Sequence, residues 1–140
     1  FKFNQPFTSY FNTSNVTNMN GMFGYAYKFN QPLTSFDTSN VTNMSQMFYN
    51  AVVFNQPLDS FNTSNVTNMN GMFMYAFKFN QPLTSFDFSN VEYMRDIFVG
   101  SSRNNWFTIV TKIYFNSYNY EKNQLRSWTS KLKNYYYWFI

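Results

Sequence analysis

The chain has 140 residues, of which 24% are aromatic and only 11% are charged. This composition is too apolar for a disordered chain, and the mean hydropathy of -0.44 is too low for a membrane protein, so no membrane span is expected. Residues 1–102 hold four basic and five acidic side chains, whereas residues 103–140 hold six basic and one acidic. The first part therefore offers phosphates no attraction, and no nucleic acid is expected as a partner.

A tandem repeat organises most of the chain. The tetrapeptide Phe-Asn-Gln-Pro and the tripeptide Ser-Asn-Val each occur four times, and successive copies of the tripeptide begin 25 residues apart, at Ser14, Ser39, Ser64 and Ser89. We predict four tandem repeats over residues 1–101, the first truncated at its N-terminal side, and a non-repeat C-terminal cap or tail over residues 102–140. Because the chain starts inside a repeat without a methionine, an upstream part with any signal peptide is expected to precede it.

The first element expected in each unit is a short strand. In the second repeat it follows Pro32, and the residues Leu33, Phe36 and Thr38 have the spacing leucine-x-x-leucine-x-leucine. This spacing is typical of a short strand whose alternate side chains face inward.

The second expected element is a helix of about three turns, because apolar residues follow Ser39 at intervals of three or four. Ser39 or Asn40 can cap its first turn. The apolar residues concerned are Val41, Met44, Met47, Phe48 and Ala51.

One strand and one short helix fit a 25-residue unit, whereas two-helix repeats need about 33 residues or more. The predicted fold class is therefore an α/β repeat, a leucine-rich-repeat-like solenoid with one short strand and one short helix per unit and an atypical C-terminal cap. We expect the inward residues of the second repeat to be Leu33, Phe36, Val41, Met44, Phe48, Ala51 and Phe54. An asparagine ladder that satisfies backbone groups at a bend is expected at Asn15, Asn40, Asn65 and Asn90.

The repeat pattern ends after Gly100. Residues 106–115 are rich in aromatic and β-branched side chains and predict one strand. The simplest interpretation of the tail is a cap over the last apolar face of the array. A decayed fifth repeat and a shifted reading frame are the alternatives.

The repeat resembles that of the BspA-like leucine-rich-repeat bacterial surface proteins, which have surface-protein repeats of 25 or 26 residues. The resemblance is carried by Phe-Asn-Gln-Pro-Leu, Ser-Asn-Val-Thr-Asn-Met, Met-Phe and Ala between Phe29 and Ala51 and covers about residues 1–101. It implies a location at the cell surface or outside the cell, a protein or cell-surface ligand, and adhesion as a role, but no enzymatic activity. The chain departs from that family in having phenylalanine where tryptophan is usual, at Phe11, Phe36, Phe61 and Phe86.

Catalysis is not expected, because the sequence contains no histidine and no cysteine. No cofactor and no metal are predicted. The Met-x-x-Met pairs, such as Met44 and Met47, contain thioethers that can hold Cu(I), but their spacing on an apolar face favours core packing.

A row of polar residues follows the predicted strands and is the candidate binding face. If the strands form, these side chains point outward on the concave sheet, the face with which such arrays commonly bind. Solubility and strand-edge hydrogen bonding are the simpler interpretation, and a ligand or Ca²⁺ contact row is the functional one. The row consists of Asn12, Asp37, Asn62 and Asp87.

Two functions of different classes follow. The first is a non-catalytic cell-surface repeat module that acts as a structural spacer or as an adhesion and binding surface. The alternative is an ice- or crystal-binding solenoid, because Thr13, Thr38 and Thr63 form a regular row of hydroxyls. Phe88 interrupts that row, and Thr38 is expected to point inward.

Overall fold

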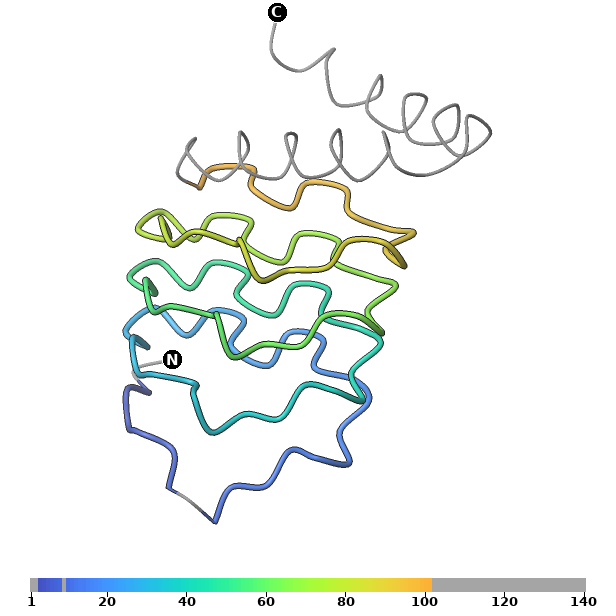
Figure 1. Cartoon of the computed structure of the whole chain (residues 1–140). Coiled ribbons are helices and arrows are strands. Elements are labelled where there is room, and N and C mark those ends of the chain that lie inside the picture. Colours follow the sequence, from blue (N-terminus) through green and yellow to red (C-terminus); the bar gives the residue numbers. More distant parts are fainter. Residues whose placement is uncertain (1–2, 9, 102–140) are drawn as a thin grey trace, which may run out of the picture.

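The computed structural model describes residues 3–8 and 10–101, which form a stack of four coils (Figure 1). We number them coil 1 (residues 3–28), coil 2 (29–53), coil 3 (54–78) and coil 4 (79–101). Each coil lies on the next, so residues 25 apart in the sequence are neighbours in space. Asn43, for example, forms parallel bridges with Asn18 on one side and Asn68 on the other.

The predicted strand and helix of each repeat are both wrong. The described residues contain no helix, and their only strand-like pairings are three isolated parallel bridges, Asn18–Asn43, Asn43–Asn68 and Asn68–Tyr93. The chain is therefore not an α/β, leucine-rich-repeat-like solenoid with a strand and a helix per unit. Its coils consist of turns and irregular segments.

Left-handed backbone conformations prevent the predicted helix. Gln46 and Asn50 have φ angles of 55° and 57°. A right-handed helix needs a negative φ at every residue, so it cannot continue through a residue with a positive φ. The equivalent residues of the other coils also have positive φ; they are Gly21, Gly71 and Asp96, and Tyr25, Tyr75 and Gly100.

Turns produce the three-residue spacing of the apolar side chains. The N–H of Phe36 donates to the carbonyl of Leu33 at 3.0 Å. The side chains of Leu33 and Phe36 are buried, and so are those of Thr38 and Val41 at the ends of the next turn. Between Leu33 and Phe36, Thr34 and Ser35 are exposed. Further turns of the same kind join Thr38 to Val41, Met44 to Met47, Phe48 to Ala51, and Ala51 to Phe54. A helix and a series of three-residue turns both place every third or fourth side chain inside.

Backbone hydrogen bonds join the coils in a regular direction over residues 44–50. Alternate N–H groups of coil 2 donate to carbonyls 24 residues further along, in coil 3, while those between them close turns within the coil. The pairs are Met44–Asn68 at 2.9 Å, and Gln46–Asn70, Phe48–Met72 and Asn50–Met74 at 2.8 Å. Coils 1 and 3 donate to coils 2 and 4 in the same way.

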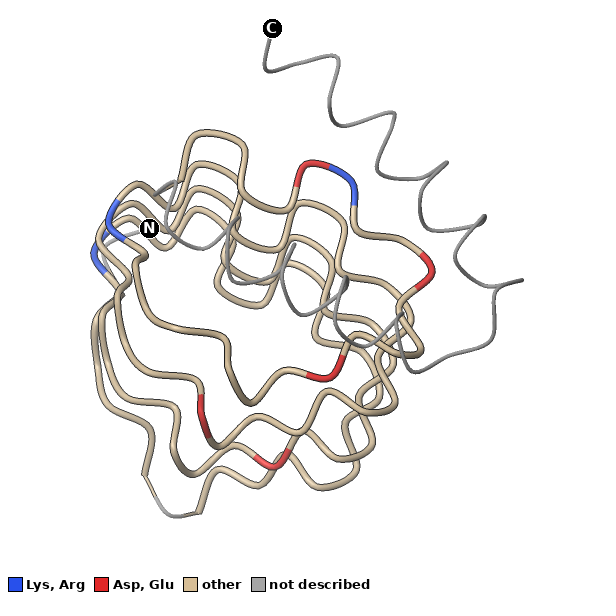
Figure 2. Cartoon of the chain, turned by 45° about the horizontal axis from the view of Figure 1, so that its top comes forward, with Lys and Arg blue, Asp and Glu red and all other residues tan. Residues whose placement is uncertain are grey.

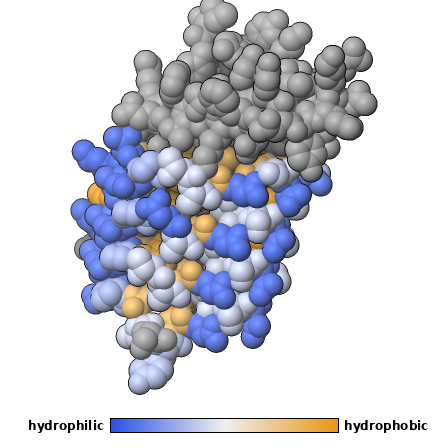
Figure 3. All heavy atoms as spheres, viewed as in Figure 1, coloured by the Kyte–Doolittle hydropathy of each residue, from blue (hydrophilic) through white to orange (hydrophobic). Residues whose placement is uncertain are grey.

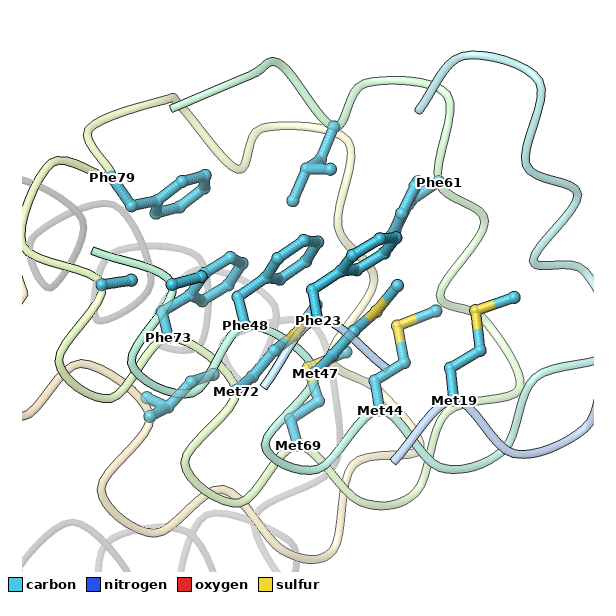
Figure 4. Close-up of a cluster of buried hydrophobic side chains, with 14 of the residues drawn as sticks. Met19, Phe23, Met44, Met47, Phe48, Phe61, Met69, Met72, Phe73 and Phe79 are labelled. Atoms are coloured by element: carbon cyan, nitrogen blue, oxygen red, sulfur yellow. The ribbon is translucent and has the colours of Figure 1, made fainter. Parts of the chain in front are cut away.

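Stacked phenylalanine rings and methionines fill the interior. Phe48 lies between Phe23 and Phe73, with ring centroids 5.4 and 5.5 Å apart and planes within 7° of parallel (Figure 4). Rows of methionine side chains, including Met44 and Met69, lie beside these rings, so they pack the core. The predicted burial of the inward residues is confirmed for Leu33, Phe36, Val41, Met44, Phe48, Ala51 and Phe54.

Buried threonines hold the backbone of the next coil. The Thr38 hydroxyl donates to the carbonyl of Asn62 at 3.0 Å and accepts from the N–H of Asn62 at 2.8 Å. Thr13 and Thr63 bond in the same way to the residues equivalent to Asn62 in coils 2 and 4. All three are at most 2% exposed. The threonine row considered for ice binding therefore lies inside the stack.

Asparagine side chains add bonds between coils on the surface. Three side-chain amides donate to serine carbonyls of the preceding coil at 2.7 to 2.8 Å; the pairs are Asn40–Ser14, Asn65–Ser39 and Asn90–Ser64. No helix in the described part of the chain has both the length and the apolar character needed to cross a membrane. The predicted cap or tail at 102–140, with its strand at 106–115, lies outside the described residues.

Candidate functional site

The row predicted as a binding face occupies a turn in each coil. In every coil, Oδ1 of the row residue accepts a hydrogen bond from the backbone N–H two residues later, at 2.8 to 3.0 Å. This is an Asx turn, which Asn and Asp form equally well. Asn12, Asp37 and Asn62 are exposed and Asp87 is half-buried. The row is thus a line of polar side chains at the surface, in which one oxygen of each residue shapes the local backbone.

Ser39 controls the protonation of Asp37. A hydrogen bond from the Ser39 side chain and a second one from its backbone N–H hold the pKa of the Asp37 carboxyl below its ordinary value of 3.8. Both bonds favour the charged form of the carboxyl. Asp37 therefore carries its negative charge at neutral pH.

The geometry of the row does not assemble a calcium site. Ca²⁺ takes six to eight oxygen ligands, but Asp37 and Asp87 are two coils apart, which is about 10 Å at the usual spacing of hydrogen-bonded backbones. Among residues 3–8 and 10–101, no group of three His, Cys, Asp or Glu side chains is placed to hold a metal ion.

A second surface feature, which the sequence analysis did not predict, is a strip of aromatic rings along the stack. It consists of Tyr27, Tyr25, Tyr49, Tyr75 and Phe77, and we call it the aromatic strip. Each ring contacts the next, with centroids 6.1, 5.0, 5.9 and 6.2 Å apart in that order. The strip therefore runs without a gap over coils 1 to 3.

Much of the aromatic strip is exposed to solvent although its side chains are largely apolar. Tyr25, Tyr27 and Phe77 are 48%, 40% and 55% exposed, and Tyr49 and Tyr75 are half-buried. A contiguous exposed aromatic surface is unusual on a soluble protein that has no partner for it.

Alternation about a buried alanine places four of these rings outside. Ala26 and Ala76 point into the core at 6% and 0% exposure, so the residues on either side of them point outward. A signal was present in the sequence, since Tyr-Ala-Tyr-Lys at 25–28 recurs as Tyr-Ala-Phe-Lys at 75–78.

A hydrogen bond joins two tyrosines of the strip, Tyr25 and Tyr49. A side-chain hydrogen bond with Tyr25, followed by burial, raises the pKa of Tyr49 above 10.0. The Tyr49 phenol is therefore uncharged at neutral pH. A tyrosine side chain has an apolar ring and a hydroxyl that can hydrogen-bond, so it suits a binding surface.

A hollow lies at the N-terminal end of the stack. It has a volume of about 480 Å³ and is lined by Phe3, Phe7, Gly21, Met22, Phe23, Gly24 and Ala26. Figure 3 shows exposed hydrophobic residues at this lower end. Its lining includes no polar side chain, so it offers nothing to orient a reacting group.

Comparison with known proteins gives one result. A family model described as "Mycoplasma protein of unknown function, DUF285" matches residues 1–110. No curated protein and no solved structure matches the chain.

Proposed function

The chain belongs to the DUF285 family, whose function is unknown, and we propose that it is a non-catalytic cell-surface module that binds a protein or another cell-surface ligand. The observation that carries this proposal is the aromatic strip. Tyrosine and phenylalanine are enriched in protein interfaces because they supply a large contact area and lose few rotamers on binding. Its exposed rings are available for such contacts.

Two further observations support a binding role. The sequence has no histidine and no cysteine, which removes the commonest general base and the thiol nucleophile. The repeats also resemble those of the BspA-like surface proteins, which favours a place at the cell surface. Because each coil adds a step of about 4.8 Å, the stack also acts as a spacer of defined length.

The proposal places binding on the aromatic strip rather than on the row Asn12, Asp37, Asn62 and Asp87. In that row, asparagine and aspartate perform the same turn-forming task. This shared task explains why both residue types occur there without requiring a ligand.

Adhesion of coated beads tests the proposal and separates the two surfaces. Fluorescent beads that carry the full chain are incubated with cultured epithelial cells and counted after washing. The strip variant combines Tyr25→Asn with Tyr75→Asn, because the equivalent residue of coil 2 is Asn50, which has the same left-handed conformation. The matched control combines Asp37→Asn with Asp87→Asn, which preserves the Asx turns.

We expect the strip variant to lose most of the adhesion and the control to keep it, with both variants as folded as the wild type by circular dichroism. Adhesion that disappears only in the Asp37→Asn, Asp87→Asn control would assign binding to the polar row instead. Wild-type beads that adhere no better than beads coated with albumin would contradict the proposed function itself.

A further inference from the structure

Positive charge accompanies the aromatic strip. Lys28 and Lys78 are exposed and follow directly after Tyr27 and Phe77, the two end rings of the strip. Only one other cationic side chain, Arg95, occurs in the described part of the chain, and charged residues are sparse over the coils (Figure 2). Cations are thus concentrated beside the exposed rings.

No negative charge opposes these lysines within the segments that form the strip. Residues 21–28, 46–53 and 71–78 contain no aspartate and no glutamate. Complementary charge steers a partner to a surface and selects against partners of the same sign. The strip therefore fits a ligand with negative charges.

The spacing of the lysines defines the ligand further. Coil 2 has Val53 where coils 1 and 3 have Lys28 and Lys78, so these two lysines are separated by two coil steps. Two coil steps are about 10 Å. One sugar unit of an extended polysaccharide is about as long as one coil step, so charges on every second sugar are about as far apart as Lys28 and Lys78.

The rings suit the uncharged faces of such a polymer. The C–H faces of sugar rings pack on exposed aromatic rings, while phenol hydroxyls and the side chain of Asn50 can exchange hydrogen bonds with sugar hydroxyls. Resting on the proposed binding function of the strip, we infer that the aromatic strip with Lys28 and Lys78 binds an acidic polysaccharide that carries one carboxylate on every second sugar.

Hyaluronan oligosaccharides are the probe, because their carboxylates have this alternation. Binding to the full chain is measured by isothermal titration calorimetry. We expect the wild type to bind and the Kd to rise by roughly tenfold or more in Lys28→Gln, Lys78→Gln and in Tyr25→Asn, Tyr75→Asn, since both remove contacts to the ligand. The control variant is Lys131→Gln, Lys133→Gln, which removes the same amount of charge from the basic tail and should bind like the wild type.

Three outcomes would overturn the inference. They are the absence of hyaluronan binding, a loss that occurs only in the tail variant, and equally tight binding of polyglutamate, which would make the partner an acidic polypeptide. The bead assay distinguishes these failures from a failure of the proposed function. Adhesion that depends on Tyr25 and Tyr75 but survives hyaluronidase treatment of the cells would reject the polysaccharide and retain the binding module.

Discussion

Single side chains set the distance between neighbouring coils. A hydroxyl such as that of Thr38 is inside the stack and bonds both backbone groups of the residue opposite. Valine has nearly the same shape as threonine but leaves both backbone groups without this partner. The same arrangement recurs at three coil junctions, so its contribution is repeated through the molecule.

We predict that Thr38→Val lowers the free energy of unfolding by about 1 to 3 kcal/mol, the cost of two lost hydrogen bonds. Urea unfolding followed by circular dichroism measures the effect. Thr38→Ser is the control, because it keeps the hydroxyl and should lose only about 0.8 kcal/mol for its missing methyl group. If valine were tolerated better than serine, the hydroxyl would not be the stabilising group.

The carboxyl of Asp37 makes stability depend on pH. Its pKa is lowered on folding by the Ser39 side chain and then by the Ser39 N–H. A lowered pKa stabilises the folded state at pH values above the ordinary value, and this stabilisation is lost as the pH falls through the folded pKa. We predict that Ser39→Ala raises the pKa of Asp37, as measured by NMR titration, and reduces the loss of stability on acidification below pH 3.8.

The matched control for this prediction is Ser64→Ala. Ser64 donates through both its side chain and its N–H to Asn62, which does not ionise. The acid dependence of unfolding should be unchanged in this variant. An equal change in both serine variants would show that the Asp37 carboxyl is not the titrating group.

At the scale of the turn, left-handed residues decide where the chain reverses. Gly71 has a φ of 59°, and an added Cβ would approach no neighbouring atom closer than 3.6 Å. Gly100 has a φ of 71°, and there an added Cβ would lie 2.5 Å from the ring of Tyr75. Substitution of Gly71 therefore tests backbone strain alone, whereas substitution of Gly100 adds a steric clash.

We predict that Gly71→Ala costs about 1 to 2 kcal/mol, the price of a left-handed alanine, and that Gly100→Ala costs more. Thermal unfolding of both variants measures the difference. In a Tyr75→Asn background, the additional loss at Gly100 should disappear. A persistent difference in that background would mean that the Tyr75 ring is not its cause.

At the scale of one coil, a phenylalanine inside the stack contributes more than its equivalent at an end. Phe61 is 2% exposed, whereas Phe11 is 39% exposed. We predict that Phe61→Ala lowers the free energy of unfolding by about 3 to 5 kcal/mol and that Phe11→Ala lowers it by less. Chemical denaturation of both variants tests this, and equal losses would contradict the stacked arrangement of the coils.

The same scale shows what the sequence could and could not predict. The burial of Leu33, Phe36 and Met44 followed from their spacing, because apolar side chains turn inward in any repeat that stacks. The secondary structure could not be predicted from this spacing, because i→i+3 turns and a helix share it. Glycine adopts the left-handed conformation readily, as Gly71 does, but at Gln46 a residue without this preference adopts it, so the helix could not be excluded from the sequence.

The candidate site was predictable only in part. The outward position of Asp37 could be predicted, because this polar residue stands between Phe36 and Thr38, which were both expected to point inward. The aromatic strip did not, because Tyr25 and Tyr49 occupy different positions of the repeat and meet only when neighbouring coils stack. The motif Tyr-Ala-Tyr-Lys, read with its second copy, was the available signal.

At the scale of the whole molecule, each coil depends only on its neighbours. Deletion of residues 54–78 joins Val53 to Phe79 and brings coil 2 onto coil 4 with every backbone donor opposite an equivalent acceptor. We predict that this variant folds cooperatively with a lower Tm, because one coil and one junction are lost. Deletion of residues 54–65 is the control; it removes half a coil, destroys the register and should prevent folding, as judged by NMR chemical-shift dispersion.

The uniform direction of the hydrogen bonds over residues 44–50 and their equivalents has a consequence for inheritance. Since each junction presents the same donors to the same acceptors, replication slippage that duplicates or removes one repeat of the gene changes the length of the protein without creating a new kind of junction. A gain or loss of one repeat therefore changes the length of the stack by one coil step, about 4.8 Å, and leaves the other junctions as they are.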